Sequence, residues 1–174
     1  MAATGIPFVV YGVVVYAFFL ATFVYAIGFV GNVAVPKSID SGTAAPLAEA
    51  LLVNVALLAL FAVQHSVMAR RSFKRWWTRV VPEAAERSTF VLAATLVLAL
   101  LMWQWRPIAE PLVWSGEHPA LAVALQAVFW LGWGVLLVST FLINHFELFG
   151  LAQVVARLRG RALPRSDFRK PLFY

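Results

Sequence analysis

The sequence predicts an all-α, polytopic membrane protein: four transmembrane helices plus a short interfacial amphipathic helix, in a single membrane domain over residues 1–174. Two observations predict this class. Hydrophobic residues make up 62% of the chain and charged residues only 13%, a more apolar composition than soluble domains usually have. The chain also contains four long apolar runs, at about 7–30, 47–68, 89–105 and 120–143. A helix needs about 20 such residues to cross the hydrocarbon layer.

The first run, 7–30, predicts a retained membrane helix rather than a cleaved signal peptide. Residues 1–6 carry no Lys or Arg, and the run is longer than the roughly 7–15 apolar residues of a signal peptide's core. The following residues, 31–46, are rich in Gly, Pro, Ser and Asp. These residue types favour turns, so we expect a loop between the first two helices.

The second, third and fourth runs are almost free of charge, since Glu49 is the one Asp, Glu, Lys or Arg within any of the four. A basic segment joins 47–68 to 89–105. A second loop, over 106–119, is interrupted by Pro107, Pro111 and Pro119. We therefore expect three further spans, with the chain reversing its direction between each pair.

After the fourth run, residues 146–160 predict a short amphipathic helix. Apolar residues recur there at helical spacing, while Gln153, Arg157 and Arg159 take other positions. Such a helix is typical of a segment lying along the headgroup boundary. Gly150 is the expected bend. The basic tail, 161–174, is predicted to be extended because Pro164 and Pro171 prevent a regular helix.

The basic residues are distributed unequally between the two sides of the predicted bundle. Twelve of the fourteen lie in the segment between the second and third runs or after the fourth run, and only Lys37 and Arg106 lie in the other two loops. The positive-inside bias predicts a multi-pass protein of the bacterial inner membrane, with both termini cytoplasmic and anionic headgroups as partners on that side. No basic segment carries the interleaved aromatic residues of a nucleic-acid binding surface, so we expect no nucleic-acid partner despite the net charge of +6.

Three ionisable residues near the ends of apolar runs are candidate catalytic residues: His65, His145 and Glu147. Counting along the helices places both histidines at similar depth near the cytoplasmic side. A neutral imidazole offers one donor and one acceptor, so it can carry a proton or bind a metal. Glu147 can orient His145 only if the helix ends there, because residues i and i+2 do not share a helical face. The alternative is structural, since polar side chains often link membrane helices by hydrogen bonds. No metal site is predicted, and without cysteine the chain has no thiolate nucleophile.

Three strings carry a resemblance to a known family: FAVQHSVMARRSFKRWW (61–77), ERSTFVLAATLVLALLMWQWRPI (86–108) and VSTFLINHFELFGLAQV (138–154). They resemble the NnrU-type membrane proteins, and most closely the methanethiol S-methyltransferase branch, which is similar to the isoprenylcysteine carboxyl methyltransferases. The resemblance implies a membrane enzyme that transfers a methyl group from S-adenosyl-L-methionine to a small thiol, converting methanethiol to dimethyl sulfide. Arg70 and Arg87 border the predicted site as possible cofactor contacts.

One family feature has no counterpart in this sequence. In these families an Arg-His-Pro element, followed by two more helices, comes shortly after a segment like Pro171–Tyr174. The resemblance therefore implies that the chain is the N-terminal part of a longer enzyme, inactive by itself, with most cofactor contacts beyond Tyr174. Two alternatives stay open: a haem-binding protein similar to the NnrU-like carotenoid isomerases, with His65 as axial ligand, and a non-catalytic membrane subunit.

Overall fold

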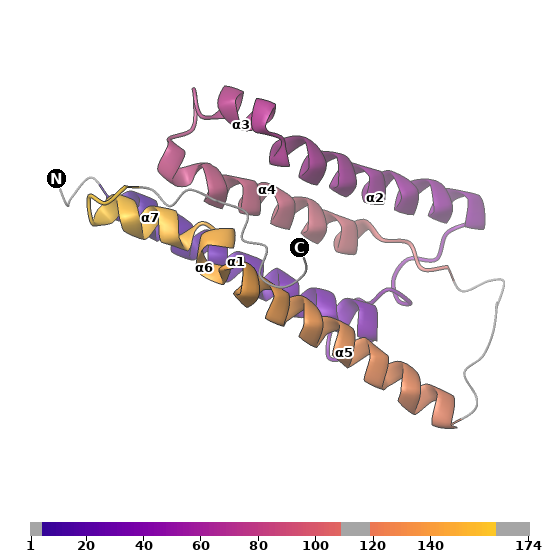
Figure 1. Ribbon diagram of the computed structural model, residues 1–174. Helices are drawn as coiled ribbons and strands as arrows, with labels where there is room; N and C mark the ends of the chain where they lie inside the picture. Colours follow the sequence, from indigo (N-terminus) through magenta and orange to yellow (C-terminus); the bar gives the residue numbers. More distant parts are fainter. Residues whose placement is uncertain (1–4, 109–118, 163–174) are drawn as a thin grey trace.

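The computed structural model describes residues 5–108 and 119–162, and every regular element within those ranges is an α-helix (Figure 1). The helices are α1 (Ile6–Gly31), α2 (Leu47–Ala69), α3 (Arg71–Trp77), α4 (Glu83–Gln104), α5 (Pro119–Ile143), α6 (His145–Leu148) and α7 (Leu151–Leu158). Most of the tail predicted over 161–174 lies outside the described residues.

Four of these helices, α1, α2, α4 and α5, are long and apolar enough to cross a membrane, which confirms the predicted fold class. The third span begins at Glu83 rather than at Thr89. Pro82 precedes it, and Glu83 and Glu86 lie in its first turn, where negative charge is favourable to the helix dipole. The prediction placed the start too late because it counted only uncharged residues.

The short helix α3 was not predicted from the sequence. It follows Arg70, whose extended backbone ends α2. Its aromatic side chains pack on one another: Phe73 stacks on Trp77 with ring centroids 5.7 Å apart, and Trp76 lies 5.7 Å from the same indole. A helix of seven mostly basic and aromatic residues is too short for apolar periodicity to reveal it.

The predicted interfacial helix is divided in two at Gly150, which has a φ of +89° and begins α7. Helix α7 lies along α1 and also contacts α4 (Figure 1). Val154 is completely buried, and Gln153 and Ala156 are nearly so. The apolar face of α7 therefore packs on the ends of two membrane helices. We call this side of the bundle the α7 end, and the opposite side, with the loop after α1, the Lys37 end.

Small residues allow α7 to approach α1 and α4 closely. A Cβ on Gly12 of α1 would lie 2.8 Å from Cγ2 of Val154, and one on Gly150 would lie 2.5 Å from Oγ of Ser88. Ser88 is fully buried in α4 and its hydroxyl has no hydrogen-bond partner. Three segments distant in the sequence thus meet at this serine.

Helix α5 is packed quite differently, because none of its residues is buried. It lies beside α1 (Figure 1) and meets it through aromatic rings: Trp133 lies 5.3 Å from Phe23, and Phe129 covers Gly31. Its remaining apolar side chains are exposed on the surface of the bundle, which suits contact with lipid acyl chains.

At the Lys37 end, hydrogen bonds tie the loops to the helices. The Asn54 side chain of α2 donates to the Arg106 carbonyl (2.8 Å) and accepts from the Arg106 backbone nitrogen (2.9 Å). The indole of Trp105 donates to the carbonyl of Ile39 (3.0 Å). The buried amide of Asn54 therefore fixes the point where the chain leaves α4.

We expect Gly150→Ala to lower the free energy of unfolding by about 2 kcal/mol or more. The substitution adds the strain of a left-handed backbone at a residue with a side chain and forces Ser88 to move. Gly134→Ala in α5 is the matched control, because nothing lies within 4 Å of its Cβ. Unfolding in detergent micelles, titrated with denaturant, measures both. Equal midpoints for the two variants would contradict the close packing at Ser88.

Candidate active site

His145 begins α6 and is buried, with 4% of its surface exposed. The preceding residue, Asn144, has a φ of +94° and separates α5 from α6. This break directs the imidazole toward α1, where Tyr16 contacts it. A continuous helix would not place the ring in the same way.

Both imidazole nitrogens of His145 are hydrogen-bonded. Nε2 lies 2.7 Å from the Tyr16 hydroxyl, and Nδ1 lies 2.8 Å from the Thr140 hydroxyl. The Thr140 hydroxyl has one proton, which it donates to the carbonyl of Leu137 (2.7 Å). Thr140 must therefore accept from Nδ1–H, and in a neutral ring Nε2 then accepts from Tyr16. These hydrogen bonds form a directed chain, in which each donor points the same way, from the Tyr16 hydroxyl through the imidazole and Thr140 to the carbonyl of Leu137.

Aromatic rings surround the imidazole of His145. Phe141 stacks on it with centroids 4.3 Å apart, Phe149 lies 4.8 Å away and Phe146 5.5 Å away. Burial lowers the pKa of His145 below its ordinary value of 6.5. The neutral, directed form of the ring is accordingly favoured at neutral pH, which leaves Nε2 as its basic atom.

Glu147 lies close to His145 in the sequence but binds a different partner. The helix does end at this point, as the predicted pairing required, yet Glu147 Oε2 accepts from the side-chain amide of Asn144 (2.8 Å). The Glu147 backbone carbonyl accepts from the amide of Gln153 in α7 (3.1 Å). Glu147 thus helps to fix the turn around His145.

Arg87 of α4 reaches the same turn. Its Nε donates to the carbonyl of Leu148 (2.6 Å), and its guanidinium lies 5.0 Å from the centre of the Phe90 ring. Burial disfavours the charge of this guanidinium, and the carboxylates of Glu86 and Glu147 partly offset that effect. Arg87 therefore supplies a partly buried cation beside the His145 turn.

His65 does not join His145. Its imidazole is exposed on α2 and packs on Phe61 and Phe90, with centroids 5.6 and 5.1 Å away. In the part of the chain that the structure describes, no contact joins the two histidines. Arg70 is exposed at the junction of α2 and α3. The structure therefore brings together His145, Glu147 and Arg87, while His65 borders them across Phe90 and Arg70 does not contact them.

Sequence reasoning missed Tyr16 and Thr140, the two direct partners of His145. Both are hydroxyl-bearing residues within apolar runs, at a depth that matches His145. Their depth could have indicated them as possible partners of His145, but depth cannot show which face of α1 meets α5. Among the described residues no group of three His, Cys, Asp or Glu side chains could hold a metal ion.

Known proteins are similar to this chain over nearly its whole length. A methanethiol S-methyltransferase of Mycobacterium tuberculosis is 54% identical over 166 residues, which cover 95% of this chain and 68% of that protein. Methanethiol S-methyltransferase 2 of Bradyrhizobium diazoefficiens is 53% identical over 94% of this chain and 62% of its own length. The chain belongs to the methanethiol S-methyltransferase family.

Within this family, the chain spans about two thirds of the length of the relatives it matches. Nurim of Rattus norvegicus is more distant, at 36% identity over 65% of the chain. No family model and no solved structure matches. The names of the closer relatives imply a methyl donor and do not favour the haem alternative, for which His65 was the expected ligand.

We predict that the Nδ1 atom of His145, and not Nε2, carries the proton in the neutral ring. Nitrogen-15 NMR of the imidazole in detergent measures this directly, with His145→Gln to assign the signal. Thr140→Val removes the acceptor of Nδ1–H, so the proton should move to Nε2 and bind the Tyr16 oxygen instead.

Thr89→Val is the matched control for that experiment. Thr89 makes a similar contact, 3.0 Å from the Tyr11 hydroxyl, but does not touch His145. A proton that stays on Nδ1 in Thr140→Val, or that moves in Thr89→Val, would contradict the directed chain.

Proposed function

We propose that the protein catalyses methyl transfer from S-adenosyl-L-methionine to a small thiol and converts methanethiol to dimethyl sulfide. The observation that carries this proposal is the identity of about half of all residues to methanethiol S-methyltransferases over about 95% of the chain. The chain spans about two thirds of the length of those relatives, and the activity is therefore stated as a proposal. The buried hydrogen-bonded chain at His145 supports it independently.

The reaction is a displacement in which thiol sulfur attacks a methyl carbon and the carbon–sulfur bond to the donor breaks. The thiol proton must leave, because a thiolate is the better nucleophile. We propose that the Tyr16 oxygen accepts this proton while the Tyr16 hydroxyl proton passes to Nε2 of His145. The products are the thioether, the demethylated donor and an imidazolium with protons on both nitrogens.

The arrangement of His145 fits this role in three ways. The bond from Nδ1 to Thr140 holds the ring with its basic nitrogen toward Tyr16. Burial keeps the ring neutral before reaction, because it lowers the pKa of His145. The surrounding phenylalanine rings exclude water and suit an apolar thiol. We assign His145 as the base and Tyr16 as the proton carrier.

Residues of the His145 turn fit the charged part of S-adenosyl-L-methionine. Arg87 offers a guanidinium for a carboxylate and Glu147 a carboxylate for an ammonium group. The side-chain oxygen of Gln153 is buried beside them without a hydrogen-bond partner. When bound, the donor supplies an electrophilic methyl carbon. We propose that Arg87, Glu147 and Gln153 hold it, and that His65, exposed beyond Phe90, lies at the edge of the site.

We also propose that the α7 end faces the cytoplasm of a bacterial inner membrane. Of the eleven Lys and Arg residues that the structure describes, nine lie in the segments at that end, and basic segments stay on the cytoplasmic side. Anionic headgroups would bind there, and a water-soluble methyl donor would reach Arg87 from the cytoplasm.

We predict that Tyr16→Phe lowers kcat by at least about tenfold, because proton transfer by a positioned group contributes about 100-fold or more. The natural gene is expressed in cells that make no dimethyl sulfide, methanethiol is supplied, and headspace dimethyl sulfide is measured. Tyr11→Phe is the matched control: it removes a hydroxyl from the same helix that bonds to Thr89 instead. Equal losses in both variants would contradict the role of Tyr16.

The same reaction, measured in isolated membranes buffered at a series of pH values, gives a pH profile that depends on His145. The neutral ring is the active form, so activity should fall as the pH falls through the pKa of His145. Because burial lowers that pKa, the fall should lie below pH 6.5. His145→Gln should lower the rate and remove this limb of the profile. If His145→Gln still shows the same fall in activity at low pH, the fall is caused by the titration of another group.

We predict that a cysteine in the loop after α1 is labelled from outside the cell, and one after α3 is not. The chain contains no cysteine, so Thr43→Cys and Thr78→Cys each introduce a single thiol, and both positions are exposed. Intact cells are treated with a membrane-impermeant maleimide, and permeabilised cells show that each thiol can react. Labelling of Thr78→Cys alone in intact cells would reverse the proposed orientation.

A further inference from the structure

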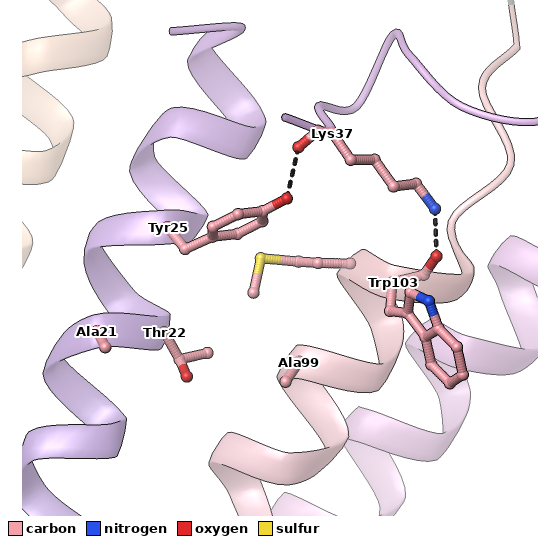
Figure 2. A pocket seen from close by; sticks show the side chains of 7 residues that line it. Ala21, Thr22, Tyr25, Lys37, Ala99 and Trp103 are labelled. Carbon is pink, nitrogen blue, oxygen red and sulfur yellow. Dashed lines mark hydrogen bonds between the residues drawn. The ribbon is translucent and has the colours of Figure 1, made fainter. Parts of the chain in front are cut away.

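A cavity of about 340 Å³ lies between α1 and α4 at the Lys37 end, away from His145. Figure 2 shows its walls: Ala21 and Thr22 come from α1 and Ala99 from α4, with Lys37 and Trp103 above them. Met102 completes the apolar lining. Its volume is within the range of about 300–1,000 Å³ that is typical of ligand sites.

Lys37 is held at the mouth of this cavity. Its backbone carbonyl accepts from the Tyr25 hydroxyl (2.9 Å), and its ammonium group donates to the carbonyl of Trp103 (Figure 2). An ammonium group has three protons, so the bond to Trp103 leaves two for a ligand. The positive charge is therefore placed above an apolar space.

A second cation, Arg106, lies close to Lys37. Burial, and then the charge of Arg106, lower the pKa of Lys37. Arg106 Nε is buried without a hydrogen-bond partner. The nearby carboxylate of Asp40 accepts from the Asn32 amide, and the one ion pair among the described residues is Lys74 with Glu86. The two cations therefore favour an anion between them.

The position of these groups along the bundle indicates what kind of anion fits. Lys37 lines the cavity, and Arg106 lies just beyond the end of α4, at the level expected for phospholipid headgroups, whereas Ala21, Thr22 and Ala99 line the cavity within the span. Trp103 is 69% exposed beside it, a usual place for an indole at the membrane interface. The cavity thus presents cations at headgroup level and apolar walls at acyl-chain level.

We propose that this cavity binds an anionic phospholipid, with its phosphate on Lys37 and Arg106 and one acyl chain between α1 and α4. A free phosphate ion would neutralise the cations but leave the apolar part of the cavity unfilled. A zwitterionic lipid would fill the apolar part of the cavity with an acyl chain but bring a positive charge next to Lys37. The proposal is independent of the proposed methyl transfer, because none of these residues contacts the His145 site.

The test measures lipid binding to the purified chain in detergent by native mass spectrometry. The probes are phosphatidylglycerol, phosphatidylcholine and inorganic phosphate. A basic residue near the headgroups changes the affinity for an anionic lipid by about fivefold, so we expect phosphatidylglycerol to bind at least about fivefold more tightly than phosphatidylcholine. An excess of inorganic phosphate should not displace it.

Two variants and a control locate the site. Lys37→Gln and Arg106→Gln should each reduce the preference for phosphatidylglycerol by about fivefold, whereas Lys74→Gln, at the α7 end, should leave it unchanged. Ala99→Leu fills the cavity and should reduce the binding of both lipids. Unfolding midpoints identify variants that fold, and Arg106 keeps its backbone bonds to Asn54 in any variant.

Three results would overturn the proposal. The first is an unchanged lipid preference in the folded Lys37 and Arg106 variants. The second is an equal loss in Lys74→Gln, which would indicate a nonspecific effect of charge. The third is displacement of phosphatidylglycerol by inorganic phosphate, which would identify an anion site without a lipid.

Discussion

Ser88 is fully buried where α4 meets α1 and α7, and the close contact at this residue determines the shape of the α7 end. The missing side chains of Gly12 and Gly150 let the three backbones approach one another. In a bilayer, apolar surface alone does not draw helices together, so fit between small residues matters more than in water. Because α7 is anchored there, α6 and the turn that carries His145 are anchored with it.

Two positive-φ residues on either side of α6 determine what that turn can do. Asn144 follows α5 and Gly150 precedes α7, so His145 and Glu147 lie in a single helical turn between two bends. Arg87 closes the turn from α4 by its bond to the Leu148 carbonyl. A histidine, a carboxylate and a guanidinium are thereby gathered from two segments, and the third segment, α1, contributes the Tyr16 hydroxyl.

The membrane spans could be predicted from composition because the bilayer sets a minimum length for each apolar run, and α1, α2 and α5 begin and end close to their predicted bounds. The position of His145 at the end of the fourth membrane helix could also be predicted from the sequence. Its partners were not, since the rotation of α1 about its axis depends on packing at Gly12 rather than on a hydrophobic pattern: α1 is apolar on every side. His65 shows the same limit, because depth alone placed it with His145, whereas its ring packs on Phe90 and makes no described contact with His145.

Packing restricts the choice of residues much more strongly in α4 than in α5. Helix α4 has buried residues, among them Ser88 and Phe90, whose size and shape must fit their neighbours. Helix α5 has no buried residue. Among the described residues, only a few side chains of α5 have a protein neighbour of fixed shape, such as Phe129, Trp133 and Thr140. We expect leucine, valine and phenylalanine to exchange at the exposed positions of α5 at little cost in stability, as long as the helix stays apolar. The residues that cannot be exchanged so freely are those with partners in the described chain, such as Thr140, so the tolerance of each position to substitution follows its contacts and not its hydrophobicity.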